Sequence, residues 1–125
     1  MTPKDWTVIV VEDTFDDRHL ASAILAHYGV NVIVAHNGKE CLRLLDTVHP
    51  TMIITDLAMP EMDGWEMLRQ LRANDATYDI PVVAITAYHS ADVAHDVARA
   101  GFDAYFPKPI SPYNFVDSLA VLVEN

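Results

Sequence analysis

Short apolar segments alternate with segments of helical periodicity along the whole chain. The apolar segments are rich in β-branched residues, and three of them end directly at an acidic or hydroxyl-bearing side chain. Such segments are typical of parallel strands that are covered on both faces. The predicted strands are residues 7–11, 30–34, 52–55, 82–85 and 104–106.

The segments between these strands carry apolar residues at the spacing of amphipathic helices, together with helix-start signals. The helices are predicted to begin near Asp16, Asn37, Asp63, Ser90 and Ser111. The first is expected to end near Tyr28, and the second to continue to Val48. In the last, Ser111 is the expected N-cap and Pro112 the first helical residue. The residues of the first helix expected to face the core are Leu20, Ala23, Ile24 and His27.

Five strands alternating with five helices predict an α/β domain. Because right-handed crossovers join consecutive parallel strands, this (βα)5 order gives a doubly wound, five-stranded parallel sheet with helices on both faces. No linker, repeat or low-complexity segment interrupts the pattern. We therefore expect a single domain over residues 1–125, with no output domain after the last helix.

Composition narrows the class of protein. The chain has 125 residues with 8 basic and 18 acidic side chains, a formal net charge of −10, and 51% hydrophobic residues. This apolar content can form a core, whereas the acidic surface would repel nucleic acid and anionic lipid. The N-terminus shows no signal peptide, and no apolar run approaches the ~18–20 residues that span a bilayer. The single cysteine, Cys41, excludes an internal disulfide. We expect a cytoplasmic protein that does not bind nucleic acid directly or insert into membranes.

The candidate chemistry lies where the predicted strands end. In a doubly wound sheet the functional site lies beyond the carboxyl ends of the strands, and these ends supply Glu12, Asp13, Asp56, Thr86 and Lys108. Carboxylates at one edge repel one another, and a hard divalent cation relieves that repulsion. A carboxylate can also attack phosphorus, while a metal and a lysine neutralise the transferred group. The pattern is consistent with magnesium-dependent phosphoryl transfer.

Four motifs at these strand ends occur in a fixed order. They are Val10-Val11-Glu12-Asp13, residues 54–64 (ITDLAMPEMDG), Ile85-Thr86-Ala87 and Phe106-Pro107-Lys108-Pro109. In this order and at these distances they resemble the receiver domain of response regulators, and the resemblance covers nearly the whole chain. It implies a flavodoxin-like sheet with strand order 2-1-3-4-5 and a phosphoacceptor role in a two-component system or phosphorelay.

The resemblance also implies a metal site. Asp56 would be the phosphoacceptor, and its carboxylate would bind Mg²⁺ or Mn²⁺ together with Asp13 and the backbone carbonyl of Ala58. Glu12 matches the second acidic position of the family and would hold the metal through water. The family often has Asp at that position, and Glu is a common alternative.

Further residues are assigned to phosphoryl binding and switching by the same resemblance. Thr86 and Lys108 would bind phosphoryl oxygens, Tyr105 would be the aromatic switch residue, and the Lys108–Pro109 peptide bond would be cis. The phosphoryl source would be a sensor histidine kinase or a phosphotransfer protein. A downstream target protein would contact the face formed by the fourth helix, fifth strand and fifth helix. Slow autodephosphorylation is expected, without an enzyme function in the usual sense.

Three other functions fit an α/β domain of this kind less well. A hydrolase of the haloacid dehalogenase type needs a second Asp two positions after the nucleophile, where this chain has Ala58. A flavodoxin-like nucleotide binder needs a loop rich in Ser, Thr or Gly after the first strand, whereas residues 12–17 are acidic. The third is a receiver fold used as an unphosphorylated interaction module, although its phosphorylation site has suitable residues throughout.

Overall fold

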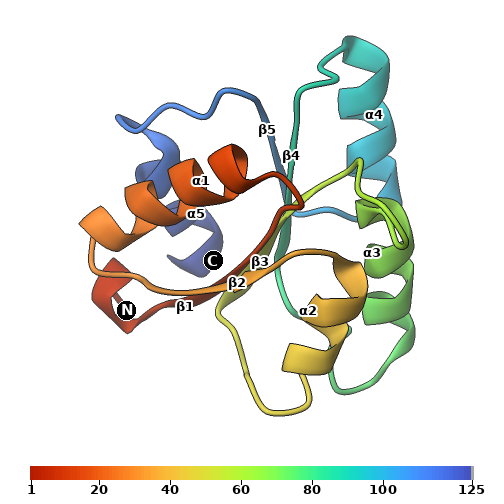
Figure 1. Ribbon diagram of the computed structural model, residues 1–125, viewed down its shortest axis with the longest axis horizontal. Coiled ribbons are helices and arrows are strands. Elements are labelled where there is room, and N and C mark those ends of the chain that lie inside the picture. The colour runs from red at the N-terminus through yellow and green to blue at the C-terminus, as the bar shows by residue number, and fades with distance from the viewer. Residues whose placement is uncertain (125) are drawn as a thin grey trace.

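A five-stranded parallel sheet forms the centre of the computed structural model, which describes residues 1–124. The strand order is β2-β1-β3-β4-β5, with helices on both sides of the sheet (Figure 1). The strands are β1 (Thr7–Val11), β2 (Asn31–Ala35), β3 (Met52–Asp56), β4 (Val82–Thr86) and β5 (Ala104–Pro107). The predicted fold class and strand order are confirmed. Asn125, the last residue of the predicted domain, lies outside the described residues.

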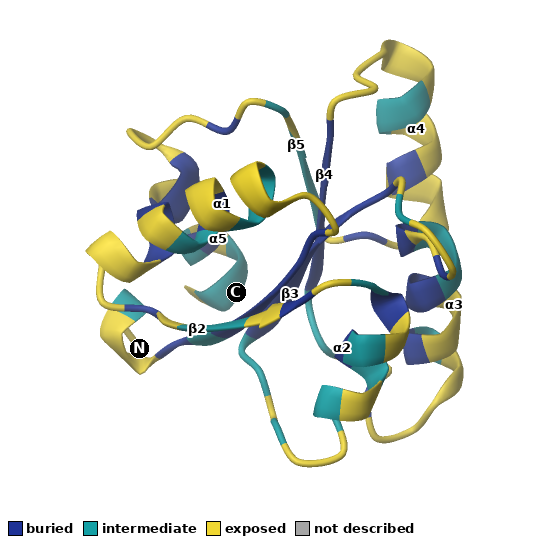
Figure 2. Cartoon of the chain, viewed as in Figure 1, coloured by how far each residue is buried: buried dark blue, intermediate teal, exposed yellow. Residues whose placement is uncertain are grey.

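Within residues 1–124, five helices pack on the sheet and divide the core into two layers. They are α1 (Phe15–His27), α2 (Gly38–Leu44), α3 (Gly64–Ala73), α4 (Ala91–Ala100) and α5 (Phe115–Glu124), and a 3₁₀ helix (η1, Pro3–Asp5) precedes β1. Helices α1 and α5 cover one face of the sheet, where Val8 and Val10 point, and α2, α3 and α4 cover the other. Figure 2 shows the central strands buried between them. Within residues 1–124, no helix has the length and apolar character that crossing a membrane requires.

The buried face of α1 differs from the predicted one. Leu20, Ala23 and His27 are exposed, and Ile24 is buried together with its neighbour Leu25 and with Ala21. The error has a simple cause: apolar residues occupy nearly every position from 20 to 26, so two overlapping faces satisfy helical spacing equally well. Packing against β1 and β2 selects the face that carries Leu25.

Two predicted helix ends also differ from the structure. Helix α2 ends at Leu44 rather than Val48, and tight turns continue the chain while Val48 still packs against the core. Helix α5 begins at Phe115, because the residues after Ser111 form a turn in which the Ser111 hydroxyl accepts the N–H of Tyr113 at 3.3 Å. In both places turns continue the chain and keep its apolar residues at helical spacing. Periodicity alone does not distinguish such turns from a helix.

Candidate functional site

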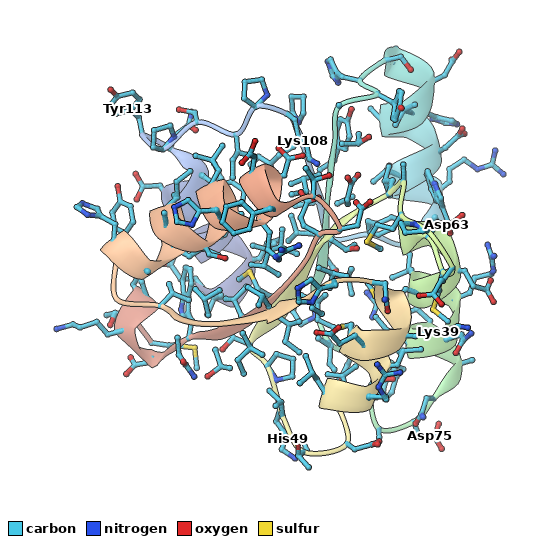
Figure 3. All side chains as sticks on the ribbon, viewed as in Figure 1. Lys39, His49, Asp63, Asp75, Lys108 and Tyr113 are labelled. Atoms are coloured by element: carbon cyan, nitrogen blue, oxygen red, sulfur yellow. The ribbon has the colours of Figure 1, made fainter. Side chains whose placement is uncertain are left out.

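The candidate site lies at the carboxyl edge of the sheet, where four strands end. β1 leads into Glu12 and Asp13, β3 ends at Asp56, β4 ends at Thr86, and Lys108 follows β5. Figure 3 places Lys108 at this edge, near the top of the view. The structure thus brings to one edge the five side chains that were selected from strand ends in the sequence.

An acidic cluster occupies the centre of this edge. Glu12, Asp13 and Asp56 each offer a carboxylate oxygen, and these oxygens lie within 4.8 Å of one another. Glu12 is fully buried and Asp56 nearly so, whereas Asp13 is exposed. The cluster is therefore open on one side, which suits Mg²⁺, an ion that keeps several of its waters when it binds to proteins.

The Lys108 ammonium lies against this cluster and joins three elements. Its Nζ donates hydrogen bonds to Glu12 Oε1 at 3.1 Å, to Asp56 Oδ2 at 2.9 Å and to Asp17 Oδ2 at 2.9 Å. Burial acts to lower the pKa of Lys108, but the hydrogen bonds to Glu12, Asp17 and Asp56 outweigh it, and the pKa is raised. The lysine therefore remains a cation throughout the physiological pH range.

Glu12 is the buried acid of the cluster. Burial raises the pKa of Glu12 to about 8, although the Lys108 ammonium acts in the opposite direction. Lys108 Nζ also lies 2.9 Å from Oε2, but the two atoms are not aligned as a hydrogen bond, and Oε2 has no hydrogen-bond partner among the described residues. A buried polar atom without a partner is costly, and a cation or its bound water would satisfy this one. The three carboxylates therefore fit Mg²⁺, because the ion or its water would supply the partner that Glu12 Oε2 lacks.

A cavity of about 540 Å³ opens between the loops that follow β3 and β4. Its lining includes Ala58, Trp65, Thr86 and Tyr88. Ala58 donates its backbone N–H to Asp56 Oδ1 at 3.3 Å, and the buried Thr86 hydroxyl accepts the N–H of Tyr88 at 3.1 Å. The cavity therefore has room for a small molecule at this edge of the sheet, beside the hydroxyl group at the end of β4.

Tyr105 on β5 is held by the loop that follows β4. Its hydroxyl lies 2.6 Å from Nδ1 of His89, and the two rings stack with centroids 5.7 Å apart. Thr86 ends β4 and His89 lies three residues later in the loop, so the loop that contacts the Thr86 hydroxyl also contacts the Tyr105 ring. The Lys108–Pro109 peptide bond is cis, as the resemblance implied.

Comparison with known protein families decides the classification. A family model described as "Response regulator receiver domain" matches residues 8–120. The chain belongs to this family. Receiver domains act as phosphoacceptors in two-component signalling, and they interact with histidine kinases or phosphotransfer proteins and with downstream targets. The resemblance and the phosphoacceptor signalling role predicted from the motifs are confirmed.

Individual proteins similar to this receiver domain include several response regulators. It is 31% identical over 113 residues to the polar-differentiation response regulator DivK of Brucella anthropi, covering 90% of this chain and 92% of that protein. Among solved structures, the chemotaxis response regulator CheY4 of Vibrio cholerae is 25% identical with a TM-score of 0.85, covering 94% of this chain and 98% of that one. The receiver domain of the Francisella response regulator 1452 is 27% identical with a TM-score of 0.87, covering 96% and 98%.

One relative is much longer than this receiver domain. The regulatory protein AtoC of Escherichia coli is 31% identical over 117 residues, covering 94% of this chain and only 24% of that protein. Receiver domains of this kind therefore occur both as most of a protein and as a small part of one. The single-domain organisation over residues 1–125 stays a prediction.

Two residues that contact the site were missed in the sequence. Asp17 lies in the acidic segment after the first strand, where the sequence gives no sign of its partner, yet its carboxylate binds the Lys108 ammonium. His89 belongs to none of the four motifs, yet it contacts the Tyr105 hydroxyl. Both contacts join different elements of the domain, and no spacing rule connects an α1 residue to a lysine 91 positions later.

Gly64 is expected to be intolerant of a side chain. A Cβ at this position would lie 2.5 Å from the carbonyl oxygen of Asp56 and 3.1 Å from Cα of Leu57. Because these are backbone atoms of β3 and its loop, Gly64→Ala should displace Asp56, lower the free energy of unfolding by about 2 kcal/mol and slow phosphorylation. Urea unfolding checks this, with Gln70→Ala on the exposed side of α3 as the control. Equal stability of Gly64→Ala and the unsubstituted domain would contradict the prediction.

Proposed function

We propose that this receiver domain accepts a phosphoryl group on Asp56 and signals by the resulting change on the face formed by α4, β5 and α5. One observation carries the proposal: the Asp56 carboxylate lies between a lysine ammonium and two further acids that offer ligands to a metal. With a metal ion bound to those acids, the carboxylate would lie between two cations, and the charge on the transferred oxygens would be neutralised from both sides.

The proposed metal ligands are the residues implied by the motifs. Asp13, Asp56 and the backbone carbonyl of Ala58 would hold Mg²⁺ or Mn²⁺, and Glu12 would bind through water. When bound, the ion supplies positive charge that offsets the negative charge of the acidic cluster and of a phosphoryl group. Because Glu12 is fully buried, this residue would approach the metal from inside the protein rather than from the solvent.

The residues of the chain perform the rest of the proposed step. A carboxylate oxygen of Asp56 attacks the phosphorus of the phosphodonor, a new oxygen–phosphorus bond forms, and the bond to the leaving group breaks. The leaving group is a histidine nitrogen of a kinase or phosphotransfer protein, or acetate when acetyl phosphate is the donor. Lys108 and the Thr86 hydroxyl then bind phosphoryl oxygens. Attack by water later releases inorganic phosphate and restores the carboxylate.

The proposed signal passes from Thr86 to Tyr105. Turning the Thr86 hydroxyl toward a phosphoryl oxygen would break its hydrogen bond with the N–H of Tyr88, and the next residue of that loop, His89, holds Tyr105. Tyr105 would then leave His89 and turn inward. This movement changes the surface that a target protein contacts. Exposed residues expected at this contact are Asp92, His95, Asp96, Arg99, Tyr113, Asn114 and Asp117.

The partners of the proposed function are proteins. A sensor histidine kinase or a phosphotransfer protein supplies the phosphoryl group, and a target protein binds the switched face. The formal net charge of −10 supports this choice, because it disfavours nucleic acid and anionic lipid as direct ligands. A cytoplasmic location, where such kinases present their phosphohistidine, is part of the proposal.

Phosphorylation is expected to require a divalent cation, and this requirement tests the proposed function. Incubation with acetyl phosphate and Mg²⁺ should add one phosphoryl group per chain, detected by intact mass spectrometry, and excess EDTA should abolish the addition. Labelling that is unchanged by EDTA, or no labelling with Mg²⁺ present, would contradict the proposal.

Glu12→Gln provides a finer test of the metal site. The substitution keeps the shape of the buried side chain and an oxygen that can accept the hydrogen bond from Lys108, but removes the carboxylate. The affinity for Mg²⁺ should fall by about ten-fold, since a group that supports metal ligands is lost. Titration followed by tryptophan fluorescence measures this, because Trp65 lines the cavity beside Ala58. The matched control is Glu61→Gln, an exposed position that should retain the full affinity.

A further inference from the structure

All the hydrogen-bond donors of Lys108 are occupied in this structure. An ammonium group has three N–H donors, and these go to Glu12 Oε1, Asp17 Oδ2 and Asp56 Oδ2. If Lys108 is to bind a phosphoryl oxygen, one of these three partners must leave. The proposed phosphoacceptor function thus depends on which carboxylate the lysine can release.

The three partners differ in how much their release would cost. The Glu12 side chain is fully buried, so separating it from the ammonium leaves an unpaired acid inside the protein. The Asp56 side chain is 11% exposed, and it stays beside Lys108 because it carries the phosphoryl group itself. The Asp17 side chain is 40% exposed, and water can replace the lysine as its partner. Asp17 is the partner that is released at the lowest cost.

The position of Asp17 favours its role as a temporary partner. It lies in the first turn of α1, where the backbone N–H groups and the helix dipole stabilise a carboxylate that has no other partner. Its Oδ2 and the Oδ2 of Asp56 are both 2.9 Å from the same nitrogen, so they are separated by no more than twice that distance. Its negative charge therefore also repels an incoming phosphoryl group.

We propose that Asp17 is a positioning residue that occupies one donor of Lys108 until a phosphoryl oxygen replaces it. This inference rests on the proposed phosphoacceptor function and adds to it a competition between two anions for one ammonium. In the resting domain Asp17 holds Lys108 in place and reduces the affinity for the phosphoryl group. In the phosphorylated domain its carboxylate is solvated at the start of α1.

Beryllofluoride, a phosphoryl analogue that binds carboxylates without a lasting chemical step, provides the test. In the presence of Mg²⁺, Asp17→Asn should bind beryllofluoride about three- to ten-fold more tightly than the unsubstituted domain, measured by the change in tryptophan fluorescence, to which Trp65 contributes beside the cavity. The factor corresponds to one partly exposed charge-assisted contact. Phosphorylation by acetyl phosphate should accelerate by a similar factor. A residue that only supported the fold would change the affinity in the opposite direction when replaced.

Asp16→Asn is the matched control for this test. Asp16 lies beside Asp17 in the first turn of α1, is exposed, and makes no hydrogen bond with Lys108 among the described contacts. Its replacement removes the same charge and should change beryllofluoride affinity by less than two-fold. The Mg²⁺ affinity is measured without the analogue in both variants, and the beryllofluoride affinities are compared at saturating Mg²⁺, so that a change in metal binding does not pass for the competition at Lys108.

The possible results separate this inference from the proposed function. If the unsubstituted domain and Asp16→Asn bind the analogue but Asp17→Asn gains nothing, or if both variants gain equally, the role of Asp17 is wrong and the phosphoacceptor function stands. If the unsubstituted domain neither binds beryllofluoride nor accepts a phosphoryl group, the proposed function fails and the inference fails with it. A gain confined to Asp17→Asn supports both.

Discussion

Asp56→Asn is expected to abolish phosphorylation by acetyl phosphate while the domain remains folded. An amide cannot form the acyl phosphate that a carboxylate forms, so the loss should be complete rather than partial. The substituted side chain keeps an oxygen that can accept the hydrogen bond from Lys108, and the strand around it is buried between two helix layers. Intact mass spectrometry should show no added phosphoryl group, and circular dichroism should show the same helix content as in the unsubstituted domain.

The control for this experiment is Asp75→Asn. Asp75 lies at the end of the molecule opposite to Lys108 in Figure 3 and is exposed. The Asp75→Asn variant should be phosphorylated as fully as the unsubstituted domain. If Asp56→Asn were labelled to the same extent as Asp75→Asn, another residue would be the acceptor.

Lys108→Ala should have the second largest effect on phosphorylation, and it should change phosphorylation and Mg²⁺ binding in opposite directions. Phosphorylation should slow by about 100-fold or more, because a preorganised cationic donor to the transferred group is lost. The affinity for Mg²⁺ should instead increase, since a positive charge next to Glu12 and Asp56 disappears. Isothermal titration calorimetry and phosphorylation rates measure the two effects separately.

The same substitution should lower the free energy of unfolding by about 3 kcal/mol without metal, because Glu12 and Asp56 lose their counterion inside the protein. Added Mg²⁺ should recover much of that loss by binding only the folded domain. Urea unfolding with and without Mg²⁺ checks this, and Lys39→Ala, an exposed position, should change neither stability nor phosphorylation. Weaker Mg²⁺ binding in Lys108→Ala would contradict the account of the charges at this site.

Much of the fold and of the site could be predicted because strand ends are marked in the sequence. An apolar, β-branched segment that stops at Asp56 or Thr86 indicates both a buried strand and the edge at which its last residue lies. Rules for parallel sheets then place these ends together, and they place Lys108 beside them. The positions of the five site residues follow from the apolar segments that precede them and from the rule that the carboxyl ends of parallel strands share one edge of the sheet.

The features that were missed depend on packing between elements. The face of α1 was ambiguous because both Leu20 and Ala21 continue an apolar stripe, and only the sheet decides between them. The contacts of Asp17 with Lys108 and of His89 with Tyr105 join side chains from different elements. Such contacts depend on where two backbones meet and on side-chain rotamers, which periodicity does not encode.

The most direct test of the central claim is to identify the phosphorylated residue chemically. The domain is phosphorylated with acetyl phosphate and Mg²⁺, the acyl phosphate is reduced with borohydride to homoserine, and peptides are sequenced by mass spectrometry. The account predicts homoserine at position 56 and at no other acidic residue. Homoserine at Asp13 or Asp17, or a stable phosphoryl group on a histidine or hydroxyl side chain, would contradict it.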